Sequence, residues 1–195
     1  MLNPILERVK AIGGKVFTDG DYNLNIIGIR KANGEANRFD DELHCIYKVD
    51  GQWRDRWWPI TTDPGLYWLK NPMNRAGTAA VVADRQYPGV WQLGKHKGQY
   101  AALVQTGGSI AVHRDDNMDS KVDYSPDNIV EGYFGINCHR ATTRSGGSVS
   151  VDKWSAGCQV FADPKHFAAF MNICELQKAK RGWDKFTYTL LQEKP

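Results

Sequence analysis

A cysteine and a histidine that could act as nucleophile and base lie in GINCHRATTRSGGSVSVDKWSAGCQVF, residues 135–161. His139 follows Cys138, and Cys158 comes after a loop of Thr, Ser, Gly and Arg residues. A thiol becomes a strong nucleophile when a neighbouring base takes its proton, and imidazole has a suitable pKa for that step. The segment therefore predicts a catalytic pair of Cys158 and His139. The alternative is a structural role, because free cysteines are among the most buried residues.

The residues before Cys158 are suited to binding an oxyanion. Ala156 and Gly157 are small, so we expect the backbone N–H groups of Gly157 and Cys158 to be unobstructed. Such groups stabilise the charge on a tetrahedral intermediate, which indicates acyl transfer. The four cysteines show no CxxC spacing and are predicted to be free thiols. We expect Cys138 to be a packing neighbour and Cys174 to be a core residue.

Charged and aromatic residues flank the pair. Arg140, Arg144 and Lys153 are candidate contacts for substrate carboxylates, with solvated loop charges as the alternative. Trp154 and Tyr133 are candidate walls of a substrate groove, and a purely structural role for either ring is the alternative.

Oxygen-bearing side chains occupy positions 1, 3, 5 and 9 of a calcium-loop pattern: Asp115, Asn117, Asp119 and Asp123. The loop departs from that pattern where Ser120 replaces the glycine and Pro126 replaces the bidentate glutamate. A structural calcium ion is therefore one prediction for residues 114–123, and a solvated acidic turn is the alternative. We expect no cofactor to be required.

The remaining histidines have no paired metal ligands at useful spacing: His44, His96, His113 and His166. A zinc peptidase with a site assembled by folding is the weakest enzyme alternative. It would lose activity with a chelator and keep activity without Cys158.

The elements that must position these residues are predicted from periodicity and turn signals. Apolar residues at helical spacing predict helices over 2–12 and 164–180, with Asp163 as the N-cap of the second. Short strand-like runs separated by Gly, Pro and Asp fill 22–112, with a hairpin turn at Asp50-Gly51. Further strands are predicted over 132–137 and 185–192. We predict one α+β domain, mainly β, over 1–195, built as a sandwich or barrel, with 1–14 as a packed helical appendage.

Composition limits the partners. The net charge of +3 is small and its cations are scattered, so nucleic acid is not expected as a partner. The sequence contains no apolar run long enough for a membrane span, and residues 1–17 lack the apolar core of a secretory signal. We therefore expect a monomer that is made in the cytoplasm and has no membrane partner.

Residues 133–161 resemble the signature of the L,D-transpeptidase catalytic domain family, in which a histidine and a loop precede a Ser/Thr-His-Gly-Cys box. His139 matches that histidine, and Ser155-Ala156-Gly157-Cys158 matches the box. TTDPGLYWL, residues 61–69, resembles the Pro-Gly stretch that precedes the site in that family. The box histidine is Ala156 here, and Gln159-Val160 follows the cysteine. The ending WSAGCQVF is similar to that of proteins of phage and prophage origin.

The resemblance implies a β-rich fold in which Cys158 attacks a carbonyl in the peptide stem of bacterial peptidoglycan. The attacked carbonyl would belong to the L-centre of the diamino acid at the third stem position. His139 would act first as base and then as acid, oriented by the backbone carbonyl of Arg140 or by the side chain of Asn137. Ser155 would lie among the substrate contacts.

We therefore expect a peptidoglycan hydrolase that resembles a phage endolysin, is made in the host cytoplasm and acts on the cell wall. The alternatives are a transpeptidase that forms cross-links, an enzyme on another acyl substrate, and a wall-binding module in which Ala156 marks a decayed site. Thiol reactivity separates them, because a catalytic Cys158 is expected to have a depressed pKa.

Overall fold

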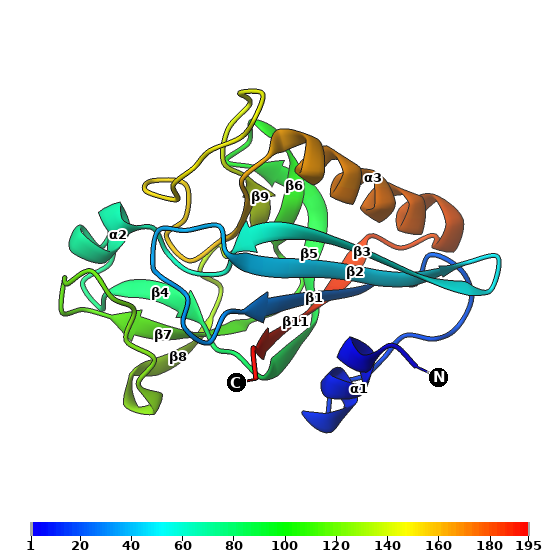
Figure 1. The fold of residues 1–195 in the computed structure, drawn as a ribbon, viewed down its shortest axis with the longest axis horizontal. Coiled ribbons are helices and arrows are strands. Elements are labelled where there is room, and N and C mark those ends of the chain that lie inside the picture. Colours follow the sequence, from blue (N-terminus) through cyan, green and yellow to red (C-terminus); the bar gives the residue numbers. More distant parts are fainter. Residues whose placement is uncertain (1, 195) are drawn as a thin grey trace.

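The computed structural model describes residues 2–194, and eight of its strands close into a barrel (Figure 1). Around the barrel the order is β1 (Asn25–Arg30), β11 (Lys185–Gln192), β5 (Arg85–His96), β6 (Tyr100–Gln105), β9 (Cys138–Arg140), β10 (Gln159–Phe161), β3 (Gln52–Thr61) and β2 (Asp41–Val49). Beside it lies a three-stranded sheet of β4 (Thr78–Val81), β7 (Ile110–Asp115) and β8 (Ile129–Gly132). The predicted α+β fold, mainly β, is confirmed.

Three α-helices and a short 3-10 helix complete the fold: α1 (Pro4–Ala11), α2 (Leu66–Lys70), η1 (Pro126–Asn128) and α3 (Pro164–Arg181). Leu6 and Val9 of α1 are buried in an apolar cluster with residues of β1, β2 and β11. None of the helices within residues 2–194 is both long enough and apolar enough to cross a bilayer.

Helix α3 matches its sequence signals closely. Asp163 caps its first turn by accepting a hydrogen bond from the Lys165 N–H at 2.7 Å, and Gly182 ends it with a left-handed φ of 77°. Phe170 and Cys174 face the core and are fully buried. Phe170 stacks on Phe161 of β10 with ring centroids 5.3 Å apart. The helix therefore fixes the strand that follows Cys158.

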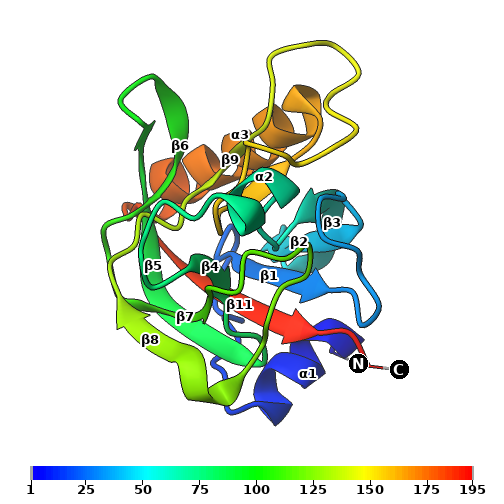
Figure 2. The same cartoon turned by 90° about the vertical axis from the view of Figure 1, so that its left-hand side faces the viewer.

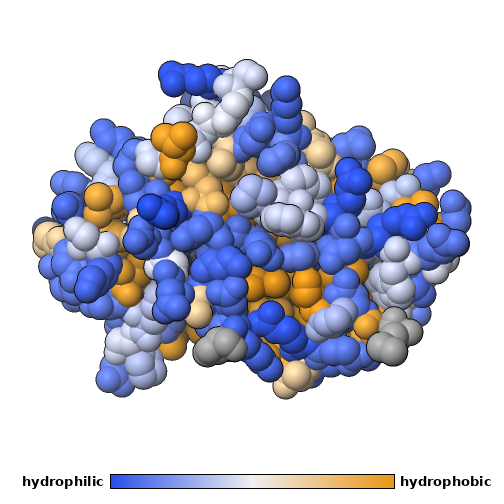
Figure 3. Space-filling view, in the orientation of Figure 1, coloured by the Kyte–Doolittle hydropathy of each residue, from blue (hydrophilic) through white to orange (hydrophobic). Residues whose placement is uncertain are grey.

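The long β2–β3 hairpin crosses the middle of the molecule in Figure 1 and turns where the sequence predicts. Asp50 and Gly51 have φ values of 51° and 73°, as a two-residue hairpin turn with two left-handed positions requires. The outward face of β3 carries exposed polar residues and the exposed Trp57. Hydrophilic residues accordingly dominate this side of the molecule, with scattered hydrophobic patches (Figure 3).

The predicted strand over 132–137 is wrong for most of its length. Strand β8 ends at Gly132, residues 133–137 are irregular, and β9 begins at Cys138. His139 therefore lies in the middle of a short strand rather than at the end of a long one. The physical reason is that side chains from the barrel take the backbone hydrogen bonds of 133–137 in place of a neighbouring strand.

The buried Gln105 of β6 binds three backbone groups of residues 132–137. Its Oε1 accepts from the Phe134 and Ile136 N–H groups at 3.0 and 2.9 Å. Its Nε2 donates to the Gly132 carbonyl at 2.9 Å. The buried Trp91 adds a hydrogen bond from Nε1–H to the Ile136 carbonyl at 2.8 Å. Two core side chains thus fix the segment that leads to His139.

Replacing Gln105 with Leu is expected to lower the free energy of unfolding by at least about 2 kcal/mol, because buried N–H and C=O groups would lose their partners. Urea unfolding of the variant and the wild type measures the difference. The exposed Gln99→Leu is the control and should change stability little. Equal midpoints for Gln105→Leu and the wild type would contradict this role.

Candidate active site

The pairing of β9 with β10 places Cys158 next to the segment that carries His139. The two strands are parallel, with Gln159 opposite Cys138, and the Gln159 N–H donates to the Asn137 carbonyl at 2.9 Å. The Asn137 N–H points at the Cys158 Sγ at 3.4 Å, and the thiol lies 3.5 Å from the Gly135 carbonyl. Cys158 and His139 line one cavity. The structure thus brings the predicted pair together.

Hydrogen bonds orient the His139 ring and define its protonation. Its Nδ1 lies 2.9 Å from the Arg140 carbonyl and 3.3 Å from the Tyr100 hydroxyl oxygen. Tyr100 donates its own proton to the same carbonyl at 3.1 Å. Because a carbonyl only accepts, Nδ1 carries the proton and Nε2 is left free as a base. The Arg140 carbonyl therefore occupies the orienting position that the family resemblance implies for it.

Asn137 does not orient His139. Its Oδ1 accepts from the Gln105 N–H at 2.9 Å, and its Nδ2 lies 3.2 Å from Nδ1 of His96. His96 in turn stacks on His139, with ring centroids 3.9 Å apart and planes 24° apart. The orienting role proposed for the Asn137 side chain is therefore wrong, because that side chain holds the second histidine in place.

The electrostatics of the site favour a neutral pair. Burial, with a smaller contribution from His96, lowers the pKa of His139 to about 3. Burial raises the pKa of the Cys158 thiol to about 11, against the effect of the Asn137 N–H. The expected depressed thiol pKa is therefore wrong. At neutral pH the resting site holds a thiol and an imidazole, so the proton must move as the thiol attacks rather than before.

The turn before Cys158 also differs from the prediction. The Gly157 N–H donates to the Ser155 Oγ at 3.1 Å, and that hydroxyl donates to the Cys158 carbonyl at 2.8 Å. Ser155 is fully buried, so its predicted contact with substrate is wrong. The predicted use of the Gly157 N–H as an oxyanion donor is also wrong, because that group is already bonded. The Cys158 N–H is the remaining candidate of the two.

Gly157 is nevertheless required at its position. Its φ is 120°, and a Cβ added there would lie 2.6 Å from the Ala79 carbonyl oxygen. A glycine at this point lets the chain pass close to β4 and turn into β10. Its contribution to the site is therefore the path of the backbone that presents Cys158.

Three cavities with shared walls form a groove around Cys158. The cysteine cavity of about 360 Å³ contains Cys158, His139 and His96 in its wall. It shares Lys97, His139 and Trp154, among others, with a lysine cavity of about 550 Å³ that adds Arg140. It shares Phe134 and Ala156 with an arginine cavity of about 320 Å³ that contains Arg114. In Figure 2 the β5–β6 hairpin, α2 and the loop before Cys158 gather at this end of the molecule.

Charges along the groove have one sign. Lys97, Arg140, Lys153 and Arg114 line it, whereas no Asp or Glu among residues 2–194 lines any of the three cavities. A groove with this lining attracts anionic ligands and repels cationic ones. The arrangement therefore favours an anionic ligand.

The other predicted contacts are divided between the groove and the surface. Trp154 is 44% exposed and stands where the cysteine and lysine cavities meet. Tyr133 is 64% exposed and lines the arginine cavity. Arg144 lies on an exposed part of the loop and lines none of the three cavities. The prediction that Arg144 binds substrate gains no support from its position.

The acidic loop is bonded internally. Asp115 is buried and accepts from the Asp123 N–H at 2.9 Å. The Asn117 Nδ2 donates to Asp123 at 2.8 Å and to Asp119 at 3.3 Å, so an amide nitrogen lies between two carboxylates. Over residues 2–194 no cluster of three or more His, Cys, Asp or Glu side chains is arranged to hold a metal ion. Calcium binding stays a prediction.

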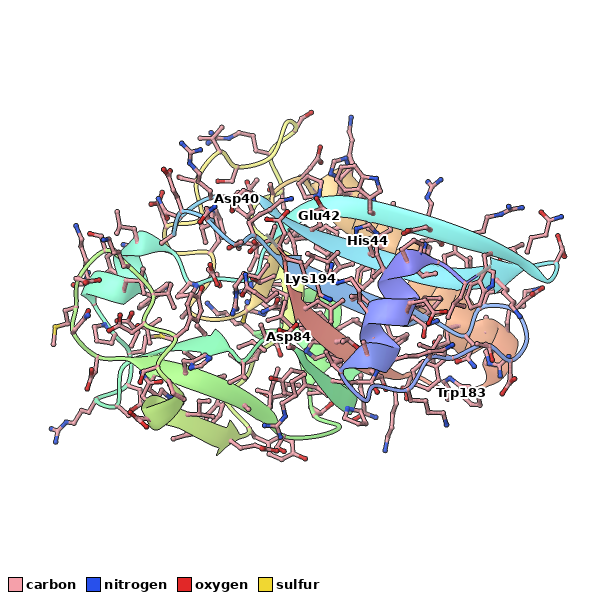
Figure 4. The ribbon with its side chains drawn as sticks, turned by 60° about the horizontal axis from the view of Figure 1, so that its bottom comes forward. Asp40, Glu42, His44, Asp84, Trp183 and Lys194 are labelled. Carbon is pink, nitrogen blue, oxygen red and sulfur yellow. The ribbon has the colours of Figure 1, made fainter. Side chains whose placement is uncertain are left out.

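The histidines considered for zinc make other contacts. His44 lies beside Glu42 on β2 (Figure 4), and its ring nitrogens are 3.1 Å from Glu42 and 3.0 Å from Asp55. Burial opposes protonation of this ring, but the two carboxylates raise its pKa overall. His113 Nδ1 lies 2.9 Å from the Ser125 carbonyl. Each of these two rings is thus satisfied by partners of its own.

Comparison with known proteins adds no relative to this description. The chain matches no protein-family model, and neither a curated protein nor a solved structure is significantly similar to it. The family resemblance of residues 133–161 therefore stays a prediction. The candidate site is supported by the geometry of this chain.

The two kinds of histidine environment predict opposite titrations. His139 should stay neutral on acidification from pH 8 to about pH 4, because its lowered pKa means that a proton binds only at low pH. His44 should gain its proton at a higher pH than free histidine does, because its pKa is raised. NMR of the imidazole ¹H–¹³C resonances measures both. A His139 midpoint near that of free histidine would contradict the neutral pair.

Proposed function

We propose that this chain is a peptidoglycan-degrading cysteine peptidase of the L,D-transpeptidase type. The observation that carries the proposal is a single cavity whose wall contains both the Cys158 thiol and the His139 imidazole, with Nδ1 of that imidazole held by the Arg140 carbonyl. The mainly β barrel agrees with the fold that the resemblance implies. The cationic lining suits stem peptides, which carry several carboxylates.

In the proposed reaction His139 Nε2 takes the thiol proton while the Cys158 Sγ bonds to the carbonyl carbon of the stem peptide. Collapse of the tetrahedral intermediate breaks the C–N bond, and His139 returns the proton to the leaving amine. Water then attacks the thioester with His139 again as base, and the thiol is restored. An amine in place of water would make the same acyl-enzyme a transpeptidase intermediate.

The neutral state of the pair limits the reactivity of the thiol. A thiol with a raised pKa is a weak nucleophile until its proton is transferred, so attack requires a carbonyl held close to both groups. Substrate binding in the groove supplies that placement. The reaction is therefore expected to be selective for bound peptides over small alkylating agents.

Two observations favour a second candidate, a wall-binding module without catalysis. The thiol is protonated at rest, and one of its two expected oxyanion donors is already bonded to Ser155. A protein that had lost catalysis would keep the groove and its charges. Binding to insoluble peptidoglycan without release of fragments is the outcome that this candidate predicts.

Digestion of purified peptidoglycan tests the proposal. The wild type should release peptides whose masses identify the cleaved bond, and Cys158→Ala should reduce release by about 10³-fold or more, since the nucleophile is removed. Cys174→Ala is the matched control, because this thiol is buried in α3 away from the groove. It should retain most of the activity.

Equal release by the wild type and Cys158→Ala would contradict the proposal. Mass spectrometry of the digest also separates the two acceptors, because new cross-linked peptides would identify transpeptidation. Binding of the wall without release by any variant would support the module instead.

A further inference from the structure

No acidic side chain among the described residues pairs with the guanidinium group of Arg114 of β7. Its Nη1 donates to the Gly77 carbonyl at 3.2 Å, and its Cζ lies 4.5 Å from the centre of the Phe134 ring. Its Nε is buried without a hydrogen-bond partner, and Arg114 forms no salt bridge within residues 2–194. A partly buried guanidinium of this kind lowers the stability of the fold unless an anionic ligand pairs with it.

The cavity that contains Arg114 adjoins the candidate nucleophile. The arginine cavity and the cysteine cavity share Phe134 and Ala156. Ala156 precedes Cys158 by two residues, which span at most about 7 Å. A group bound at Arg114 therefore lies in a cavity that shares part of its wall with the cavity that contains Cys158.

The position of His139 assigns the two ends of the groove to the two halves of the substrate. His139 must reach the leaving amine to protonate it. It lines the cysteine and lysine cavities and is not in the wall of the arginine cavity. The leaving half therefore extends towards Lys97 and Arg140, and the acyl half extends towards Arg114.

We propose that Arg114 binds a side-chain carboxylate on the acyl half of the substrate, next to the carbonyl that Cys158 attacks. A guanidinium can bind a carboxylate through two parallel N–H···O bonds. Asn74 lines the same cavity and its side-chain Nδ2 supplies a further donor, because the atom that accepts from the Ala76 N–H is Oδ1. Arg114 is the only Lys or Arg residue among the described residues in the wall of this cavity, which fits a single carboxylate.

This inference rests on the proposed function and adds the chemistry of the reacting residue. A diaminopimelate residue carries a carboxylate at the end of its side chain, whereas a lysine residue at the same position carries none. Arg114 would thus select peptides with the diaminopimelate residue. Tyr133, at the rim of the cavity, would cover the bound side chain.

Calorimetric titration of the Cys158→Ala protein tests the site without turnover. The probes are three synthetic stem tetrapeptides that differ only at the third residue: diaminopimelate, its side-chain carboxamide, and lysine. The diaminopimelate peptide should bind about tenfold tighter than the carboxamide or more, because a charged hydrogen-bonded pair is lost with the amide.

Introducing Arg114→Gln into the Cys158→Ala protein should abolish the preference for the diaminopimelate peptide. The affinity for the carboxamide peptide should stay within about twofold of that of Cys158→Ala alone. Arg114→Lys keeps the charge and should retain part of the preference. Arg54→Gln, which removes an exposed arginine of β3, is the matched control and should retain all of it. Circular dichroism and thermal unfolding check that each variant is folded.

Equal affinity for the acid and the carboxamide would overturn the inference, and so would absence of binding of all three peptides or an equal loss of both affinities in Arg114→Gln. Failure of the proposed function is distinguishable. Discrimination by Cys158→Ala, with no cleavage by the wild type, would keep the carboxylate site and reject the peptidase. Cleavage by the wild type, together with equal affinities of Cys158→Ala for the acid and the carboxamide, would keep the peptidase and reject the carboxylate site.

Discussion

The parallel pairing of β9 with β10 places Cys158 and His139, which a loop separates in the sequence, in one cavity. Strand β10 has little freedom to move, because it also pairs with β3 and packs through Phe161 against α3. On the other side, Gln105 and Trp91 hold the irregular segment that leads into β9. The geometry of the site thus depends on two short strands whose positions are set by the barrel and one helix.

Burial determines the chemistry that this geometry allows. The same packing that fixes His139 and Cys158 buries the first and partly buries the second, which disfavours the charged form of each. The charges of the site lie instead along the groove, whose walls contain Lys97, Arg140, Lys153 and Arg114. The protein thus places a neutral thiol and a neutral imidazole inside a cationic groove.

The features that the sequence predicted correctly are those with local signals. His139 and Cys158 stand out by residue type and spacing and do line one cavity, while their catalytic role stays a prediction. Helix α3 has the predicted Asp cap, and the β2–β3 hairpin has the predicted Asp-Gly turn. Each of these depends on a few neighbouring residues. The strand predicted over residues 132–137 was wrong because the apolar run of these residues resembles a strand. In the fold, the side chain of Gln105 accepts the hydrogen bonds from two of their backbone N–H groups.

Several groups at the site have no local signal. His96 appeared in the sequence only as a candidate metal ligand, and Arg114 only as the first residue of the acidic loop 114–123, because their neighbours at the site come from other elements. The direction of the thiol pKa could not be predicted, since it depends on how deeply the finished fold buries Cys158. The role of Ser155 was missed because its partners are backbone groups of its own turn.

Intact-protein mass spectrometry of the acid-quenched wild type with a stem tetrapeptide tests most directly the claim that Cys158 forms an acyl-enzyme. If Cys158 is the nucleophile, the mass of the wild type should increase by that of the acyl half of the peptide. Proteolysis should map the increase to Cys158, and hydroxylamine, which cleaves thioesters, should remove it. Peptide cleavage without any adduct, or an adduct on Cys45, Cys138 or Cys174, would contradict it.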